Sequence, residues 1–213
     1  MNLVNKLIGN GLAAALDFCF GALVATLVML WYGLDSSYLA PFIGGLLALA
    51  PDIDLPSQFA KKGVEVDHHR SPFHYPILTV PTGVTVALLI GGIPWAIIAG
   101  VCLAGHYIHD MTGPYGGLVA LWPFTQDSFS FTNGREKIGQ SKREKYIRDV
   151  GHTEWIRTFW LRPSTLSMPE LAMSYLFACI TCMANVGTWW ILVIWTSSVI
   201  AAAIVWPSNL REQ

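Results

Sequence analysis

Six apolar stretches, separated by short turns or by longer hydrophilic segments, set the pattern of the chain. They cover residues 12–32, 38–50, 77–92, 93–109, 171–184 and 188–206. A helix that crosses a membrane needs about 20 apolar residues, and several of these stretches are shorter. Gly91-Gly92 with Pro94 and the segment Asn185-Val186-Gly187 break neighbouring stretches and predict two helical hairpins. We therefore expect an all-α, polytopic membrane protein of about six short transmembrane or re-entrant helices.

Composition agrees with a membrane location. Of the 213 residues, 53% are hydrophobic and only 13% are charged, against about 25% charged residues in an average soluble domain. No linker-like or low-complexity segment divides the chain, so we predict a single membrane-embedded domain over residues 1–213. No clear cleavage pattern ends the first apolar stretch, which we expect to remain as an anchor. All four cysteines lie inside apolar stretches and are interpreted as packing residues.

Positive charge is distributed very unevenly. Six spans would place both hydrophilic segments, 51–76 and 110–170, on the same side as the two termini. All 13 lysines and arginines fall on that side, and the connections near 33–37, 92 and 185–187 carry none. By the positive-inside rule, that side is cytoplasmic. We expect a multi-pass protein of the inner (plasma) membrane with both termini in the cytoplasm.

Histidines and aspartates gather at the ends of the predicted spans on this face. His106 and Asp110 lie four residues apart, so one helix face presents both. Asp52 and Asp54 end the second stretch, where the alternative is an ordinary helix-terminating turn. Asp67-His68-His69-Arg70-Ser71-Pro72-Phe73-His74 then holds three histidines within eight residues. Such a density beside a membrane favours metal binding over isolated structural histidines.

Topology brings these helix ends to one membrane level, where we expect a single cavity. Ionisable groups at this depth are costly unless they are paired or bind metal. Mixed imidazole and carboxylate ligands suit zinc best, with Mn²⁺ or Fe²⁺ as alternatives. Because six candidates exceed the needs of one tetrahedral ion, a two-metal site that activates water is reasonable. The candidate ligands are Asp52, Asp54, His69, His74, His106 and Asp110.

Three further residues are candidates for catalysis. Arg70 follows a proposed ligand and could stabilise a phosphate of the substrate, the alternative being a salt bridge to Glu65 or Asp67. His68 or His109 could protonate the leaving group.

At these residues the chain resembles the LexA-regulated inner-membrane metal-dependent hydrolases, the YdjM-like family. That family shows Pro-Asp-x-Asp, then His-Arg-Gly-x-Thr-His, then His-x-x-x-Asp, followed by Thr-Pro-Tyr-Gly and Leu-Trp-Pro-Phe. The matching stretches, in the same order, are 51–54, 69–74, 106–110, 113–116 and 121–124. The resemblance implies a helical membrane hydrolase with metal ligands at Asp52 or Asp54, His69, His74, His106 and Asp110. A more distant similarity, to the helical zinc phospholipase C and nuclease group, favours phosphoester chemistry.

The chain departs from the family pattern at several positions. Ser71 and Phe73 replace Gly and Thr between two ligands, and Gly113 stands where Thr is usual. Family members often begin with a Thr-His pair before the first span, which is absent here. Asp17 or His152 is a candidate replacement for the missing ligand.

Metal-site segments 51–76 and 105–124 thus precede a basic cytoplasmic segment, 125–169. Between Arg135 and Arg162 it holds eight cations against four acidic residues, an excess of 8 − 4 = +4. Three interpretations compete: a solvated helix, a platform that gathers anionic membrane lipids, and nucleic-acid binding, which lacks any recognisable motif here.

The combined features favour a metal-dependent hydrolase that acts at the cytoplasmic face on a phosphoester, such as a phospholipid or lipid phosphate. The alternative is a metal-binding membrane scaffold or transporter without hydrolytic activity. Transport would require polar residues through the spans, and apart from Asp17 and a few Ser/Thr these are lacking. The sequence identifies neither the substrate nor the oligomeric state.

Overall fold

The computed structural model describes residues 3–34, 37–54, 68–112, 116–137 and 140–210. It contains two compact units, one formed by residues 1–45 with 152–213 and the other by residues 46–151. The single membrane-embedded domain expected from the sequence stays a prediction. Helices occupy all six predicted apolar stretches, so the predicted helical membrane architecture is confirmed.

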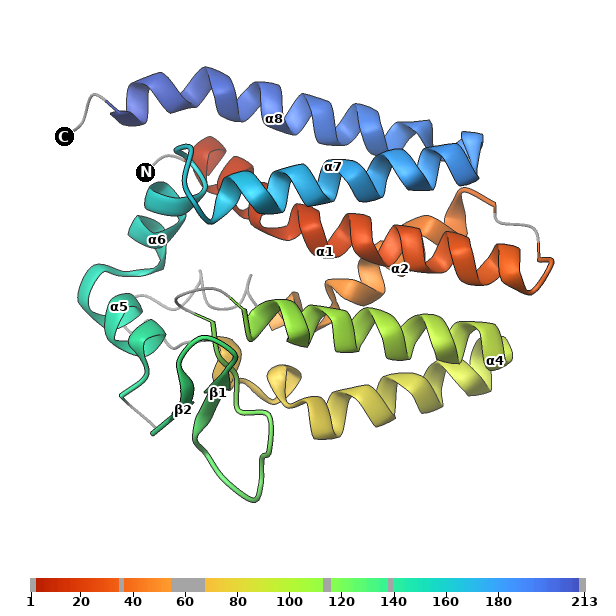
Figure 1. Cartoon of the computed structure of the whole chain (residues 1–213), viewed down its shortest axis with the longest axis horizontal. Coiled ribbons are helices and arrows are strands. Elements are labelled where there is room, and N and C mark those ends of the chain that lie inside the picture. The colour runs from red at the N-terminus through yellow and green to blue at the C-terminus, as the bar shows by residue number, and fades with distance from the viewer. Residues whose placement is uncertain (1–2, 35–36, 55–67, 113–115, 138–139, 211–213) are drawn as a thin grey trace. The chain divides into compact units, whose positions relative to one another are not determined.

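The first unit is built on three long helices. These are α1 (Leu3–Trp31), α7 (Ser167–Ala184) and α8 (Trp189–Leu210), with most of the short α2 (Leu39–Ala48), α6 (His152–Phe159) and the 3-10 turn η4 (Val186–Thr188) completing the unit. Figure 1 shows α1, α7 and α8 side by side. The predicted turn between the last two helices is present, and the Asn185 side chain accepts a hydrogen bond from the Gly187 amide.

Small residues let the helices of this unit approach closely. On α7 the buried positions are Ser167, Leu171, Ser174, Ala178 and Thr181. Their alternating spacing of three and four residues places them on one face. That face packs chiefly against α1. The Ser174 hydroxyl accepts a 2.7 Å hydrogen bond from the indole of Trp195 and thereby joins α8 to α7.

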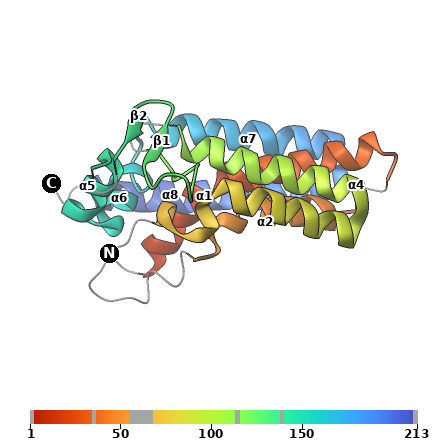
Figure 2. The same cartoon turned by 90° about the horizontal axis from the view of Figure 1, so that it is seen from below.

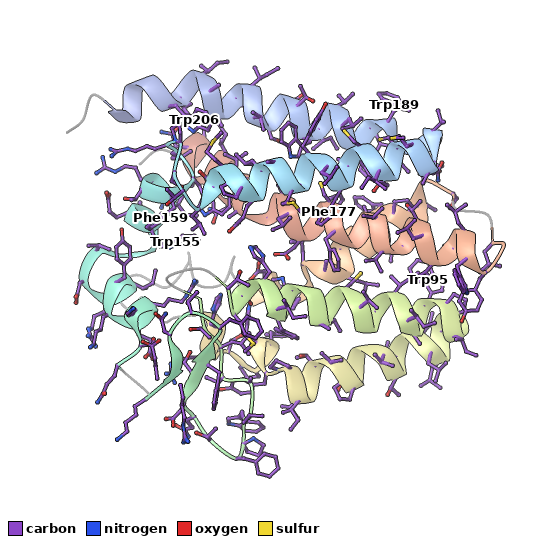
Figure 3. The ribbon with its side chains drawn as sticks, viewed as in Figure 1. Trp95, Trp155, Phe159, Phe177, Trp189 and Trp206 are labelled. Carbon is purple, nitrogen blue, oxygen red and sulfur yellow. The ribbon has the colours of Figure 1, made fainter. Side chains whose placement is uncertain are left out.

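The two ends of α8 carry tryptophans. Trp189 is exposed at the start of the helix, and the indole of Trp206 near its end donates to the carbonyl of Trp160. Figure 3 shows these two side chains at opposite ends of the helix. With a rise of ~1.5 Å per residue they are separated by about 26 Å, a spacing typical of aromatic belts at two membrane interfaces.

Gly44 is the point of closest approach between α2 and α1. A Cβ atom at Gly44 would lie 2.3 Å from the carbonyl oxygen of Gly21 and 2.5 Å from the Cβ of Ala25. We expect Gly44→Ala to lower the stability of the protein by about 1–3 kcal/mol, because backbone atoms of α1 must move. The measurement is the melting temperature in a mild detergent.

Gly11, on α1, provides the matched control. A Cβ there meets nothing within 4 Å, so Gly11→Ala should be neutral or stabilise by up to about 1 kcal/mol through helix propensity. If both variants melt like the parent protein, the close contact of α2 with α1 is wrong.

The second unit consists of a helical hairpin with small elements before and after it. Three 3-10 turns, η1 (Ala50–Asp54), η2 (His68–Arg70) and η3 (Pro72–His74), come before α4 (Pro76–Asp110). A two-stranded antiparallel sheet, β1 (Ser128–Ser130) with β2 (Gly134–Glu136), and helix α5 (Lys142–Val150) follow it. The strands pair Phe129 with Arg135.

Helix α4 is two antiparallel arms. Gly92 has a non-helical backbone (φ 74°, ψ −166°) and lies two residues before Pro94, which is the break predicted from the sequence. Figures 1 and 2 both show the two arms side by side. They touch closely, since a Cβ at Gly83 would come within 2.5 Å of Leu103. The hairpin returns the chain to its starting end and places His106 and Asp110 near the 3-10 turns.

Four helices are long and apolar enough to cross a membrane: Val4–Trp31, Pro76–Asp110, Ser167–Ala184 and Val186–Trp206. Each arm of α4 alone, 76–91 or 93–110, is shorter than the about 20 residues of a full span. The stretch predicted at 38–50 forms a helix of 10 residues, Leu39–Ala48. Short apolar helical segments thus accompany the longer helices, as the sequence predicts.

Candidate metal centre

Five of the six predicted metal ligands have described side chains that come together in the second unit. Asp52 is in η1, His69 in η2 and His74 in η3, while His106 and Asp110 occupy successive turns of the second arm of α4. All three histidines are buried, with exposed fractions of 4%, 0% and 1%. Buried imidazoles facing partly buried carboxylates form a polar cluster at the end of the hairpin.

Asp110 is the central carboxylate of this cluster. Its Oδ1 atom lies 3.5 Å from Nε2 of His69, and its Oδ2 atom lies 3.3 Å from Nε2 of His106 and 3.8 Å from Nε2 of His74. Within the described part of the chain, the buried Oδ2 atom has no hydrogen-bond donor. A carboxylate oxygen that faces two imidazole nitrogens without a hydrogen bond is in the position of a metal ligand.

Asp52 faces two of the same histidines. Its Oδ1 atom lies 3.3 Å from Nε2 of His74 and 3.9 Å from Nε2 of His106. The described residues therefore form two triads: the first triad is Asp52, His74 and His106, and the second triad is His69, His74 and Asp110. Within each triad the ligand atoms all lie within 4.8 Å of one another, and His74 belongs to both.

The donor set fits a divalent transition metal. Two ligand atoms bound to one Zn²⁺ at tetrahedral angles are separated by about 3.4 Å. The nitrogen–oxygen distances of 3.3–3.9 Å are close to that value. A divalent ion would also offset the two clustered carboxylates, whose burial is otherwise costly.

His69 is oriented by a backbone carbonyl. Its Nδ1–H donates to the carbonyl oxygen of Gly117 at 2.8 Å, and this leaves Nε2 directed toward Asp110. The amide of Gly117 in turn donates to the carbonyl oxygen of Asp110 at 2.7 Å. Hydrogen bonds of this kind fix the tautomer and orientation of metal-binding histidines.

Tyr107 joins the turn that carries His74 to the helix that carries His106. Its buried hydroxyl donates to the carbonyl oxygen of Phe73 at 2.8 Å and also hydrogen-bonds with the Thr79 hydroxyl. On the other side of His74, the Ser71 hydroxyl lies 3.4 Å from Nδ1 of the imidazole. These contacts hold the ring of His74 between the two carboxylates.

We expect Tyr107→Phe to weaken metal binding by roughly 10-fold without unfolding the protein, because it frees the turn that positions His74. The measurement is competitive metal titration of detergent-purified protein. Tyr38→Phe, the same change on an exposed tyrosine, is the control and should leave affinity unchanged. Equal affinities of the two variants would contradict a positioning role for Tyr107.

A family model described as "YdjM inner membrane protein" matches residues 17–208. The chain belongs to the YdjM inner membrane protein family. The resemblance predicted from the sequence motifs is thereby confirmed, and the match includes every residue of the two triads. A search of curated proteins and a search of solved structures found no match.

The other residues predicted at the site are either outside the described side chains or outside the two triads. The side chains of Asp54, His68 and His152 lie outside the described part of the structure. His109 is partly buried near the end of α4 and belongs to neither triad. Asp17 is buried in α1, in the first unit.

Arg70 forms an ion pair that the sequence did not indicate. Its Nε atom pairs with Glu144, the third residue of α5, and its Nη1 donates to the carbonyl oxygen of Gln126 at 3.3 Å. Glu65 and Asp67, the alternative partners expected from the sequence, lie outside the described residues. The pair joins segments more than 70 residues apart, and local sequence patterns carry no signal for such a contact. Gly117 and Tyr107 were missed for the same reason.

Proposed function

We propose that this YdjM-family protein is a membrane-embedded, metal-dependent hydrolase that acts on a phosphoester such as a phospholipid or lipid phosphate. The observation that carries the proposal is the pair of triads that share His74, in which three buried histidines face two partly buried aspartates. Zinc is the preferred metal, with Mn²⁺ or Fe²⁺ as alternatives. An ion in either triad would use the Nε2 lone pair of His74, and the Oδ1 atom of Asp110 beside His69 would offer a ligand to a second ion. Bound there, such ions lower the pKa of water and neutralise charge that develops on a phosphoryl group.

The residues around the triads have supporting roles in this proposal. The buried Nη2 atom of Arg70 has no hydrogen-bond partner among the described atoms, so it offers a donor to a phosphoryl oxygen while Glu144 holds the rest of the guanidinium. His109 is partly buried and retains contact with solvent, as a residue that delivers a proton to the leaving group requires. His68 is the other candidate for that proton transfer.

Location at the membrane favours an amphiphilic substrate. Exposed apolar side chains directly adjoin ligands along the chain: Ile53 follows Asp52, Phe73 precedes His74, and Ile108 lies between His106 and Asp110. Their exposed fractions are 67%, 49% and 55%. A lipid phosphate presents a charged group beside an apolar chain and so complements both features.

The proposed orientation places the metal centre and both termini in the cytoplasm. All 13 lysines and arginines lie in the hydrophilic segments or near the termini, and positive charge is retained on the cytoplasmic side. A periplasm-active phosphatase fused after Gln213 should therefore be inactive. An active fusion would overturn this orientation.

The decisive experiment for the activity combines metal analysis with a substrate panel. Detergent-purified parent protein, chelated and then reloaded with Zn²⁺ or Mn²⁺, is tested on aryl phosphates, aryl phosphodiesters, phosphatidic acid and phosphatidylglycerol. We expect metal-dependent turnover of at least one phosphoester and none by His106→Ala. Retention of metal without turnover would overturn the hydrolase and favour the scaffold, while a protein that binds no transition metal would overturn both.

A further inference from the structure

Helix α5 presents one strongly basic face. Ser141 and Glu144 form a reciprocal capping box that starts the helix. Lys142, Lys145 and Arg148 are exposed, and their spacing of three residues places them along one side. Arg143 and Ile147 are buried on the other side. The helix is therefore anchored by one face while its cations face outward.

The basic face continues onto the neighbouring β-hairpin. The Lys142 ammonium donates to the side-chain oxygen of Asn133 at 2.7 Å. The backbone amide of Lys142 donates to the carboxylate of Glu136 at 3.3 Å. The start of α5 therefore adjoins the hairpin turn, where Phe131 is 64% exposed. Exposed Lys137 follows the second strand. We call the group Phe131, Lys137, Lys142, Lys145 and Arg148 the cationic patch.

The positive charge of this patch is only partly offset by neighbouring carboxylates. Asp149 lies 3.6 Å from Arg148 and offsets it. Across the described residues, neither Lys142 nor Lys145 forms an ion pair with an acidic side chain. These two ammonium groups beside an exposed phenylalanine combine charge with an apolar side chain.

We propose that the cationic patch docks on the anionic headgroups of the lipid bilayer. The chain is an inner membrane protein, so a bilayer surface is always within reach of its extramembrane elements. Lysines near such a surface are attracted to anionic lipids, and amphipathic or aromatic side chains settle at the interface. Nucleic acid is the weaker candidate, because Phe131 is the one aromatic residue of the patch and no recognition motif accompanies it. The docking does not depend on the proposed hydrolase activity.

Docking would also act on the candidate metal centre through one ion pair. Glu144, in the first turn of α5, holds Arg70, which directly follows His69. An α5 fixed on the membrane surface would hold this arginine in place. Docking can be tested independently of its effect on the metal centre, because the docking measurement needs neither metal nor substrate.

The test uses the full-length protein in lipid nanodiscs. Asp149→Cys places a thiol at an exposed position beside the patch, and an environment-sensitive fluorophore is attached there. Labelled parent protein serves to subtract any signal from the native cysteines. We expect a blue-shifted emission, quenched by headgroup-level spin-labelled lipid, in discs containing phosphatidylglycerol. Phosphatidylcholine discs should give water-like emission, and high salt should reverse the shift.

Two double variants decide the outcome. Lys142→Glu with Lys145→Glu should abolish the shift, whereas Lys142→Arg with Lys145→Arg keeps the charge and should retain it. An identical emission in both kinds of disc, or an unchanged response of the glutamate variant, overturns the proposal. A response to added oligonucleotide instead of anionic lipid also overturns it and assigns the patch to nucleic acid. If the glutamate variant does not fold, the arginine variant still tests the proposal, because its emission should differ between phosphatidylglycerol and phosphatidylcholine discs.

Discussion

Replacing His74 with alanine is expected to cause the largest loss of metal among the histidine variants, because an ion in either triad would use the same Nε2 lone pair. Its Nε2 atom faces Asp52 Oδ1 at 3.3 Å and Asp110 Oδ2 at 3.8 Å. Loss of a direct ligand should weaken binding by more than the roughly 10- to 100-fold typical of residues that only orient ligands. The measurement is metal content per protein after gentle purification, with circular dichroism to verify the helical fold.

Comparison with the other histidines makes the prediction specific. His69 and His106 each belong to one triad, so His69→Ala and His106→Ala each leave the other triad complete and should lose less metal than His74→Ala. His109→Ala removes a partly buried histidine outside the triads and should retain the metal content of the parent. If His74→Ala binds as much metal as His109→Ala does, the shared-ligand arrangement is wrong.

The helices of the fold could be predicted because their signals are local. Apolar stretches long enough for helices are visible directly, and the combination of Gly92 with Pro94 indicates the break in α4 that the backbone contains. Helix starts were less predictable. Helix α1 begins at Leu3 and not near Leu12, because polar residues such as Lys6 and Asn10 interrupt the apolar pattern without interrupting the helix. The Asn10 side chain even donates to the carbonyl oxygen of Lys6, one turn earlier.

The metal centre was predictable in its ligand types and less so in its connections. His106 and Asp110 are four residues apart on a helix, and their atoms meet at 3.3 Å as that spacing requires. The sequence left Asp52 and Asp54 as equivalent candidates, and among the described side chains it is Asp52 that contacts the histidines. Ion pairs such as that of Arg70 with Glu144 depend on how distant segments pack, which no local periodicity encodes.

Gly117→Ala is expected to disrupt the second triad although it changes no ligand. Gly117 has φ of +144°, a conformation that L side chains rarely adopt. A Cβ atom there would also lie 2.6 Å from the Ser128 hydroxyl. Relief of this collision moves the carbonyl that accepts from His69 and the amide that donates to Asp110. We expect loss of the ion bound at His69 and Asp110, and a lower melting temperature, equivalent to about 2–3 kcal/mol from strain and overpacking together.

Gly134→Ala separates the effect of backbone strain from the effect of disturbing the contacts of Gly117. Gly134 also has a positive φ, +71°, but a Cβ there meets nothing within 4 Å. Gly134→Ala should therefore lose about 1 kcal/mol of stability from backbone strain alone and keep the metal content of the parent. Because both glycines flank the same small sheet, a general weakening of the sheet would affect both variants equally. Equal metal loss in the two variants would mean that the Gly117 backbone does not hold the second triad, whereas loss in Gly117→Ala alone ties metal binding to the two backbone hydrogen bonds of Gly117.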